Sequence, residues 1–261
     1  MSPTGKQQLT IDIADSVATI AICRPAKRNA LSDSLVGQLR RCFEELPDGV
    51  NAVVLHGQGE HFCAGLDLSE LQDHGVFGGI EHSRMWHAAF ERVQFGRVPV
   101  VSVLRGAVVG GGLELACSTH VRVAEPSAFY ALPEGQRGLF VGGGGSVRIP
   151  RIIGFSRMTD LMLTGRVLTA DEGQQLGLSH YLVEPGEGLA RAQELALRIA
   201  TNAPLSNYAV MHALPRIASQ PLEDGFFMEA LMAAVTQSDP AAKQRMRAFL
   251  EKRAAKVGGK K

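Results

Sequence analysis

Short apolar segments alternate with amphipathic segments over about the first 185 residues, and this alternation restricts the fold more than any other feature of the chain. Residues 17–22, 52–55, 99–104 and 121–124 have the length and β-branched content of buried strands. Residues 32–46, 83–95 and 110–117 have the spacing of helices. Strands joined by helices form right-handed βαβ units, so the pattern predicts an α/β protein with a largely parallel sheet.

Local capping signals predict where two helices begin. Ser32 precedes a stretch with apolar residues at helical spacing, so we expect it to cap the helix that follows. Thr169 and Glu172 form a T-x-x-E capping box, and Gly177 is expected to end that short helix. After about residue 185 the strand signals cease, and residues 189–200, 204–214, 222–236 and 240–253 all have helical patterns. We therefore expect an all-helical region at the end of the chain.

The composition excludes several functional classes. With 27 Lys and Arg against 26 Asp and Glu, the net charge of +1 gives no electrostatic basis for binding nucleic acid or an anionic membrane. The four cysteines include no C-x-x-C pair, and the eight histidines have no metal-binding spacing, so we expect no metal site. The sequence begins without signal-peptide features, and its apolar stretches fall short of the roughly 20 residues of a membrane span. These features predict a cytoplasmic protein without a membrane or nucleic-acid partner.

Glycine is over-represented, at 29 of 261 residues, and two glycine-containing segments are candidate binding elements. The segment 62–68 follows a buried strand, where α/β proteins bind ligands, and its Gly65 allows a ligand to approach the Leu66 amide. The segment 106–114 opens a helix with Gly110, Gly111 and Gly112, whose N–H groups are free to bind an anion. One such donor together with the Leu66 amide would form an oxyanion hole. Close packing of the backbone is the alternative explanation for both segments.

Two glutamates are candidate acid–base groups. Glu114 lies in the first turn of the predicted glycine-rich helix among apolar residues, which raise the pKa of a carboxyl group. Glu134 follows the strand-like residues 128–132. A structural role in capping the helix, for Glu114, and a solvated turn, for Glu134, remain open. The four glycines of residues 142–145 are consistent with packing at a helix start or with a flexible lid, and the sequence does not separate the two.

Several motifs occur in a fixed order along the whole chain. They are Arg24-Pro25, Arg28-Asn29-Ala30-Leu31, residues 62–68, Gly110-Gly111-Gly112-Leu113-Glu114, Pro133-Glu134, residues 142–145, Leu163-Thr164-Gly165-Arg166 and residues 248–253. Together they resemble the crotonase (enoyl-CoA hydratase/isomerase) superfamily. The resemblance implies an α/β fold, a crotonase-like spiral of ββα units over residues 1–200, followed by a C-terminal helical trimerisation region over residues 201–261. It also implies a homotrimer or a dimer of trimers.

The resemblance further implies a chemistry for the candidate residues. In the family an acyl-CoA thioester binds with its carbonyl between two backbone amides, which match those of Leu66 and Gly111. Members that hydrate 2-enoyl-CoA carry two glutamates, which match Glu114 and Glu134. The implied reaction is syn addition of water, in which Glu114 deprotonates the water and Glu134 delivers a proton to Cα. No cofactor is implied beyond the CoA of the substrate.

The resemblance also assigns substrate contacts and leaves alternatives. The positions that contact CoA or the acyl group match Lys27, Arg28, Ala30, Ala64, Gly65, Asp67, Leu68, Phe249 and Lys252, the last two commonly from a neighbouring subunit. The chain departs from many hydratases at Phe140-Val141, where an Ile-Pro pair is common, so the acyl preference stays open. Another reaction of the superfamily (isomerisation, hydrolysis or retro-aldol cleavage) and a non-catalytic CoA- or RNA-binding relative are the competing readings.

Overall fold

The computed structural model describes residues 8–70, 75–251 and 253. The chain divides into two compact units, Met1–Ala200 and Thr201–Lys261. The first unit holds the strands and the helices that cover them, and the described part of the second unit consists of helices and turns.

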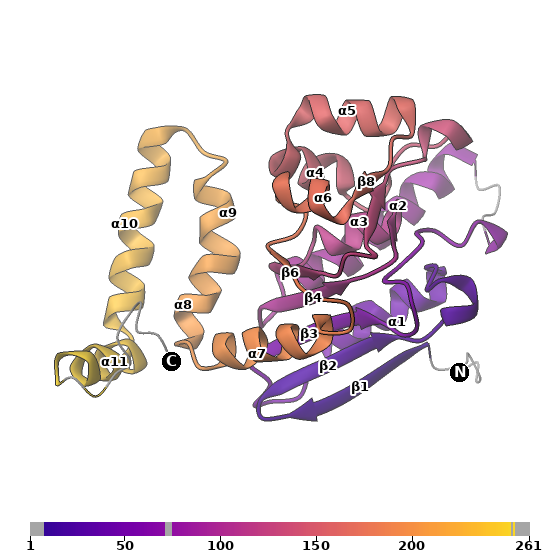
Figure 1. Cartoon of the computed structure of the whole chain (residues 1–261). Coiled ribbons are helices and arrows are strands. Elements are labelled where there is room, and N and C mark those ends of the chain that lie inside the picture. Colours follow the sequence, from indigo (N-terminus) through magenta and orange to yellow (C-terminus); the bar gives the residue numbers. More distant parts are fainter. Residues whose placement is uncertain (1–7, 71–74, 252, 254–261) are drawn as a thin grey trace. The chain divides into compact units, whose positions relative to one another are not determined.

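The first unit is organised around a six-stranded sheet (Figure 1). Its strands, in spatial order, are β1 (Leu9–Ala14), β2 (Val17–Ile22), β3 (Ala52–Gly57), β4 (Val100–Leu104), β6 (Val121–Ala124) and β9 (Tyr181–Leu182). From β2 to β9 each neighbouring pair is parallel, which confirms the predicted sheet. The edge strand β1 was not predicted; it pairs antiparallel with β2.

The strands of a second, three-stranded sheet alternate along the chain with the last strands of the first sheet. It has the order β5 (Ala107–Val109), β7 (Phe129–Ala131) and β8 (Leu168–Thr169), with β5 and β7 parallel. Gly106 makes the turn from β4 into β5 with φ +52°, and a Cβ there would lie 2.3 Å from Nδ1 of His61. Only glycine fits this turn, which directs the chain from the first sheet into the second.

Helices of the first unit pack on these sheets. They are α1 (Asp33–Glu44), α2 (Gly75–Gln94), α3 (Gly111–Ala116), α4 (Gly145–Ile153), α5 (Phe155–Thr164), α6 (Ala170–Gln175) and α7 (Gly188–Ala200), with short 3₁₀ turns η1 (Pro25–Lys27), η2 (Leu68–Glu70) and η3 (Gly135–Arg137). Both capping predictions are confirmed: Ser32 Oγ accepts the N–H of Leu35, and Thr169 and Glu172 form the complete capping box.

The start predicted for α2 is wrong, because the helix begins at Gly75 and not at residue 83. Its glycines have low helix propensity, which concealed the first two turns.

Both faces of the larger sheet are covered. One face packs against α1 and α2 in a core that contains Leu35, Leu55 and Phe90. The other face packs against α7, in a core that contains Leu195, Val54 and Val101. Strands covered on both sides need apolar residues at successive positions, which explains why residues 52–55 are all apolar and why residues 99–104 are apolar except for Ser102.

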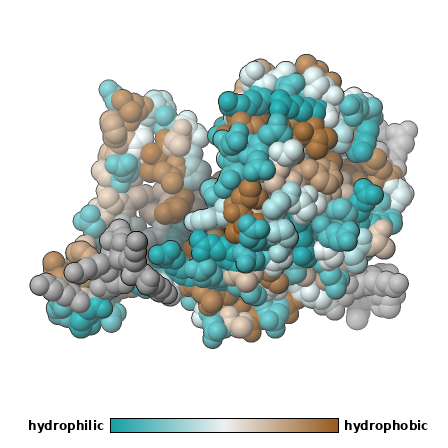
Figure 2. All heavy atoms as spheres, in the orientation of Figure 1, coloured by the Kyte–Doolittle hydropathy of each residue, from teal (hydrophilic) through white to brown (hydrophobic). Residues whose placement is uncertain are grey.

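The second unit is built from α8 (Pro204–Tyr208), a π-helical turn η4 (Ala209–Ala213), α9 (Leu214–Ile217), α10 (Leu222–Ser238) and α11 (Pro240–Leu250). Apolar residues occupy all sides of α10, and Leu222, Phe226, Phe227 and Leu231 are exposed. Figure 2 shows such brown, apolar residues on the surface of this unit. Over the ranges that the structure describes, no helix combines the length and the apolar character that crossing a membrane requires.

Candidate active site

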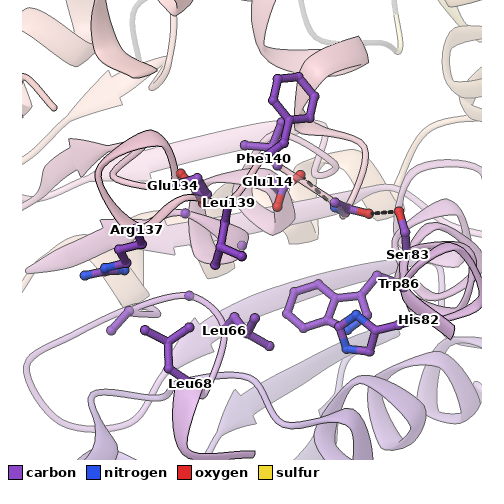
Figure 3. Close-up of a pocket in the computed structure, with 18 residues that line it drawn as sticks. Leu66, Leu68, His82, Ser83, Trp86, Glu114, Glu134, Arg137, Leu139 and Phe140 are labelled. Atoms are coloured by element: carbon purple, nitrogen blue, oxygen red, sulfur yellow. Dashed lines mark hydrogen bonds between the residues drawn. The ribbon is translucent and has the colours of Figure 1, made fainter. Parts of the chain in front are cut away.

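A cavity of about 350 Å³ in the first unit brings the predicted site residues together (Figure 3). Leu66, Gly111, Glu114 and Glu134 all line it. They come from the loop after β3, the start of α3, and the turn after β7. The sequence predicted each of these residues separately, and the fold places them around one space.

The Leu66 and Gly111 amides face the same small volume. The N–H of the neighbouring Asp67 donates to the Leu31 carbonyl, and the Leu31 N–H donates to the Gly65 carbonyl, so the Leu66 N–H points away from Leu31. A Cβ built on Gly111 would lie 3.6 Å from the Leu66 nitrogen. Among the described residues, neither the Leu66 nor the Gly111 N–H has a hydrogen-bond acceptor. The two donors are therefore available to an oxygen in the cavity.

Glycines permit this close approach of the two segments. Gly65 has φ +92°, and a Cβ there would lie 2.7 Å from the Val109 carbonyl oxygen. A Cβ at Gly112 would lie 2.3 Å from the Cys63 carbonyl oxygen. Close packing, left open as an alternative to function, is thus also present: the packing of these glycines is what brings the two amides together.

Glu114 is almost fully buried and is held by the glycine run. Its Oε1 accepts hydrogen bonds from the N–H groups of Gly143 (2.8 Å) and Gly145 (2.7 Å). Burial raises the pKa of this carboxyl above its ordinary value, and the two N–H donors and the nearby Arg148 guanidinium reduce that rise without cancelling it, because they stabilise the ionised form.

The glycine run itself is explained by this contact. A Cβ at Gly145 would lie 2.7 Å from Cγ of Glu114, and a Cβ at Gly143 would lie 2.8 Å from the Phe90 ring. Gly145 is also the first residue of α4. Of the two explanations left open by the sequence, the contacts support packing at a helix start. Residues 142–145 form a glycine cradle around the carboxyl group of Glu114.

Glu134 has different surroundings. A Cβ at Gly110 would lie 2.6 Å from Oε1 of Glu134, so this carboxyl lies against the start of α3. Its Oε2 is buried and has no hydrogen-bond partner among the described residues. Burial raises the pKa of Glu134, its own backbone N–H opposes the rise, and the negative charge of Glu114 adds to it. Figure 3 shows the two glutamates side by side in the pocket.

The predicted CoA contacts separate into two groups. Ala64, Gly65 and Leu68 line the cavity, whereas Lys27, Arg28, Ala30 and Asp67 are not among the residues that line it. The two groups nevertheless belong to loops that are bonded together, because the Ala64 N–H donates to the Arg28 carbonyl at 3.0 Å.

The carboxylate of Asp67 serves this loop packing. Its Oδ2 lies 2.7 Å from Nη2 of Arg24 and 2.8 Å from Nζ of Lys27. Burial raises the pKa of Asp67, but hydrogen bonds from Lys27, Ser69 and Arg24 outweigh it and hold that pKa well below the usual range. Asp67 therefore joins the two loops as a charged group, and its partner Lys27 is half-exposed.

The two contacts predicted near the C-terminus lie in the second unit. Phe249 is on α11 with 56% of its surface exposed. Lys252 lies outside the described residues. The role predicted for this pair, in a neighbouring subunit's site, stays a prediction.

Sequence reasoning missed one wall of the pocket. Gly79, His82, Ser83 and Trp86 of α2 all line it, and their spacing is that of one helical face. His82 lines the pocket, with its Nε2 2.8 Å from Oδ1 of Asp33. The helix predicted from the sequence starts at residue 83, so it leaves out Gly79 and His82 and does not show that these four residues share one face.

Trp86 forms part of the pocket wall beside the Gly111 amide. A Cβ on Gly111 would lie 2.7 Å from the Trp86 ring, so the indole packs directly on that glycine. In Figure 3, Trp86 and His82 lie across the cavity from Arg137, with Leu66 between them. Within the described ranges, no group of three or more His, Cys, Asp or Glu side chains has an arrangement that fits a metal ion.

Comparison with known proteins gives consistent matches over almost the whole chain. The sequence model of the family described as enoyl-CoA hydratase/isomerase matches residues 12–260. The short-chain-enoyl-CoA hydratase of Clostridium acetobutylicum is 32% identical over 240 residues, which cover 91% of this chain and 92% of that protein. A crystal structure from Rhodopseudomonas palustris CGA009, provisionally named an enoyl-CoA hydratase, is 54% identical with a TM-score of 0.94, covering 98% of this chain and 100% of the other. The enoyl-CoA hydratase of Bacillus anthracis is 29% identical with a TM-score of 0.89, covering 97% and 100%.

Proposed function

Because the chain belongs to the enoyl-CoA hydratase/isomerase family, we propose that it adds water across the 2,3 double bond of a 2-enoyl-CoA thioester. The observation that supports hydration is the convergence of two carboxyl groups, Glu114 and Glu134, on the cavity that the Leu66 and Gly111 amides also face. One carboxyl group is sufficient to move a double bond, whereas addition of water uses one group to deprotonate the water and another to protonate carbon.

The substrate carbonyl lies between the two amides. Its oxygen accepts hydrogen bonds from the N–H groups of Leu66 and Gly111, which are fixed in place by the backbone packing around Gly65 and Gly112. These donors stabilise the enolate more than the neutral thioester, because negative charge develops on that oxygen as the reaction proceeds.

Addition then proceeds with the two glutamates in opposite protonation states. Ionised Glu114 takes a proton from water, and the water oxygen forms a bond to Cβ. The π electrons of the double bond move toward the carbonyl and give the thioester enolate. Protonated Glu134 transfers its proton to Cα, and the enolate electrons form the new C–H bond. The proton held by Glu114 returns to Glu134 through solvent before the next cycle.

The surroundings of the two carboxyl groups favour this assignment of roles. Glu114 receives two backbone N–H hydrogen bonds, which favour its ionised form. Glu134 has a buried oxygen without a donor and lies beside the charge of Glu114, which favours its protonated form. Pairs of acidic groups whose environments differ in this way commonly divide into a base and an acid.

The remaining predicted contacts fit the CoA portion of the substrate. Lys27 and Arg28 are proposed to meet phosphate groups, and Ala30 and Ala64 to contact the adenine and pantetheine. Leu68 is a half-exposed apolar contact at the cavity. Phe249 and Lys252 would complete the site of a neighbouring copy.

Assembly into a homotrimer or a dimer of trimers is part of the proposal. A helix that is apolar on all sides is stable in water when other structure covers it, and α10 exposes Phe226, Phe227 and Leu231 in the single chain. Neighbouring copies are the proposed cover. Analytical ultracentrifugation of the full chain should give a trimer or a hexamer, and a monomer at micromolar concentration would contradict the proposal.

Turnover of enoyl-CoA thioesters tests the proposed reaction. The chain is incubated with 2-enoyl-CoA substrates of increasing acyl length, and the products are analysed by mass. Gain of one water in at least one product, abolished by Glu114→Gln, is the expected result. If 3-enoyl-CoA is converted to 2-enoyl-CoA while no 2-enoyl-CoA gains water, the protein is an isomerase and the proposal is wrong.

A further inference from the structure

The glycine cradle that holds Glu114 is hydrogen-bonded to α2, the helix that forms one wall of the pocket. Ser83, on the pocket-lining face of α2, has its Oγ 2.6 Å from the Gly142 carbonyl oxygen, and Figure 3 shows this bond next to the one between Gly143 and Glu114. A carbonyl oxygen only accepts hydrogen bonds, so the single hydroxyl proton of Ser83 points at Gly142. A helical serine commonly bonds back to its own helix. Ser83 Oγ does lie 3.4 Å from Nε2 of His87 on α2, but its shorter bond, through its proton, crosses to another segment.

The bond of Ser83 acts on the peptide group that binds Glu114. The Gly142 carbonyl and the Gly143 N–H belong to one peptide unit, which is planar and trans, so its C=O and N–H point in opposite directions. Ser83 holds the carbonyl end and Glu114 Oε1 accepts the hydrogen bond of the N–H end at 2.8 Å. Fixing one end fixes the other. Each hydrogen bond also polarises the peptide in the direction that strengthens its partner.

This peptide needs an anchor because glycine stands on both sides of it. Neither Gly142 nor Gly143 has a Cβ that would resist rotation of the peptide plane. A Cβ at Gly142 would have only Ser83 within 4 Å, so little else packs on the peptide from that side. If the plane turned over, the carbonyl oxygen would replace the N–H beside the Glu114 carboxylate and repel it.

A second anchor holds the next peptide and also leads to α2. Nη1 of Arg148 donates to the Gly143 carbonyl at 2.9 Å, and its Nε donates to Oε1 of Gln94 at 2.6 Å. Gln94 and Ser83 lie about three turns apart on α2. Two adjacent carbonyls of the glycine run, those of Gly142 and Gly143, are thus linked to α2.

We propose that Ser83 is a positioning residue that keeps the 142–143 peptide oriented so that its N–H holds Glu114 ionised and in place for catalysis. This inference rests on the proposed hydration. It assigns to α2 a second role besides shaping the pocket, since a change in the position of this helix would alter the acid–base group directly.

Ser83→Ala tests the inference through kinetics. The variant should lower kcat by roughly ten- to a hundred-fold, as a misplaced catalytic group does, while KM changes by less than about three-fold. Ser83→Thr keeps the hydroxyl and should restore most of kcat. Arg84→Ala, at an exposed position on the same helix, is the matched control and should leave kcat unchanged. Wild-type kcat in Ser83→Ala would overturn the inference, as would a defect that Ser83→Thr does not restore.

The pKa of Glu114 is a second measurement, and a simple loss of packing at Ser83 would not change it. Losing an N–H donor disfavours the carboxylate, so the pKa of Glu114 should rise in Ser83→Ala, and the acidic limb of the kcat/KM profile should move to higher pH. Carbon-13 NMR titration of labelled glutamate, assigned with Glu114→Gln, measures this pKa without turnover. An unchanged Glu114 pKa would overturn the inference even if the wild type hydrates enoyl-CoA. Absence of hydration by the wild type, together with the expected rise, would overturn the proposed function alone.

Discussion

The two glutamates of the pocket are the same residue type in two contrasting regions. The region around Glu114 is built from glycines that bring N–H groups against the carboxyl, with 2.8 Å and 2.7 Å hydrogen bonds from Gly143 and Gly145. The region around Glu134 is a turn that leaves Oε2 buried without a donor. Burial raises the pKa of both carboxyl groups, but two donors from other residues reduce that rise at Glu114, and this difference is the basis for proposing Glu114 as the base and Glu134 as the acid.

Replacing either glutamate should have the largest effect. Glu114→Gln and Glu134→Gln should each lower kcat by roughly 10²–10⁴-fold, the usual contribution of an acid–base group, with little change in KM. Both cradle bonds of Glu114 end on Oε1, and glutamine keeps that acceptor, so the loss would report chemistry and not displacement. Steady-state kinetics on a 2-enoyl-CoA substrate measures both variants. Full activity in either one would remove that residue from the mechanism.

Disturbing the cradle while keeping the carboxyl group of Glu114 should have an intermediate effect. The Cβ of Gly145→Ala would lie 2.7 Å from Cγ of Glu114 and push the side chain out of position. We expect a fall in kcat of about a hundred-fold, the cost of a shift near 1 Å in a catalytic group. Gly37→Ala is the matched control, because its Cβ meets nothing within 4 Å in α1, and its kcat should equal that of the wild type. Equal kcat in Gly145→Ala and Gly37→Ala would show that the cradle does not position Glu114.

The pH profile of kcat/KM should be bell-shaped, because the two glutamates must be in opposite protonation states. Activity falls at low pH, where Glu114 gains a proton, and again at higher pH, where Glu134 loses its proton. Because burial and the charge of Glu114 raise the pKa of Glu134, the alkaline limb should lie above the ordinary glutamate range. Both limbs describe the coupled pair. A profile that is flat from acid to neutral pH would contradict this division of roles.

The smallest expected effect is on stability. A carboxyl whose pKa is raised by folding binds its proton more tightly in the folded state, so stability falls as the pH rises from the unfolded-state pKa toward the folded-state pKa. Glu134→Gln removes this loss and should increase the free energy of unfolding at neutral pH by about 0.5–2 kcal/mol, a common size for functionally costly stabilising changes. Urea unfolding at neutral pH and below the ordinary glutamate pKa measures the difference. A gain of the same size at both pH values would show that charge is not its cause.

Much of the fold was predictable because it rests on local patterns. The crotonase-like α/β fold is confirmed, and the apolar runs at residues 52–55 and 99–104 predicted the buried parallel strands. The caps at Ser32 and Thr169 marked helix starts because their hydrogen bonds lie within a few residues. The short strands β5, β8 and β9 were missed, since two- or three-residue strands are defined by their partners and not by their own sequence.

The site was predictable residue by residue and not as an arrangement. Leu66, Gly111, Glu114 and Glu134 were identified from their segments, but their convergence depends on contacts between parts far apart in the chain. The α2 wall was missed because its glycines conceal a helix. No sequence spacing relates Ser83 to Gly142, and their hydrogen bond follows only from the packing of α2 against the glycine run.

The order in which the two pocket carboxyl groups lose their protons tests the account most directly. Infrared titration of the wild type, with Glu114→Gln and Glu134→Gln to assign the carboxyl bands, follows each group as the pH is raised. The account predicts that the band absent from Glu114→Gln ionises first and that the band absent from Glu134→Gln ionises last. The reverse order, or simultaneous ionisation of both groups at the ordinary glutamate pKa, would contradict it.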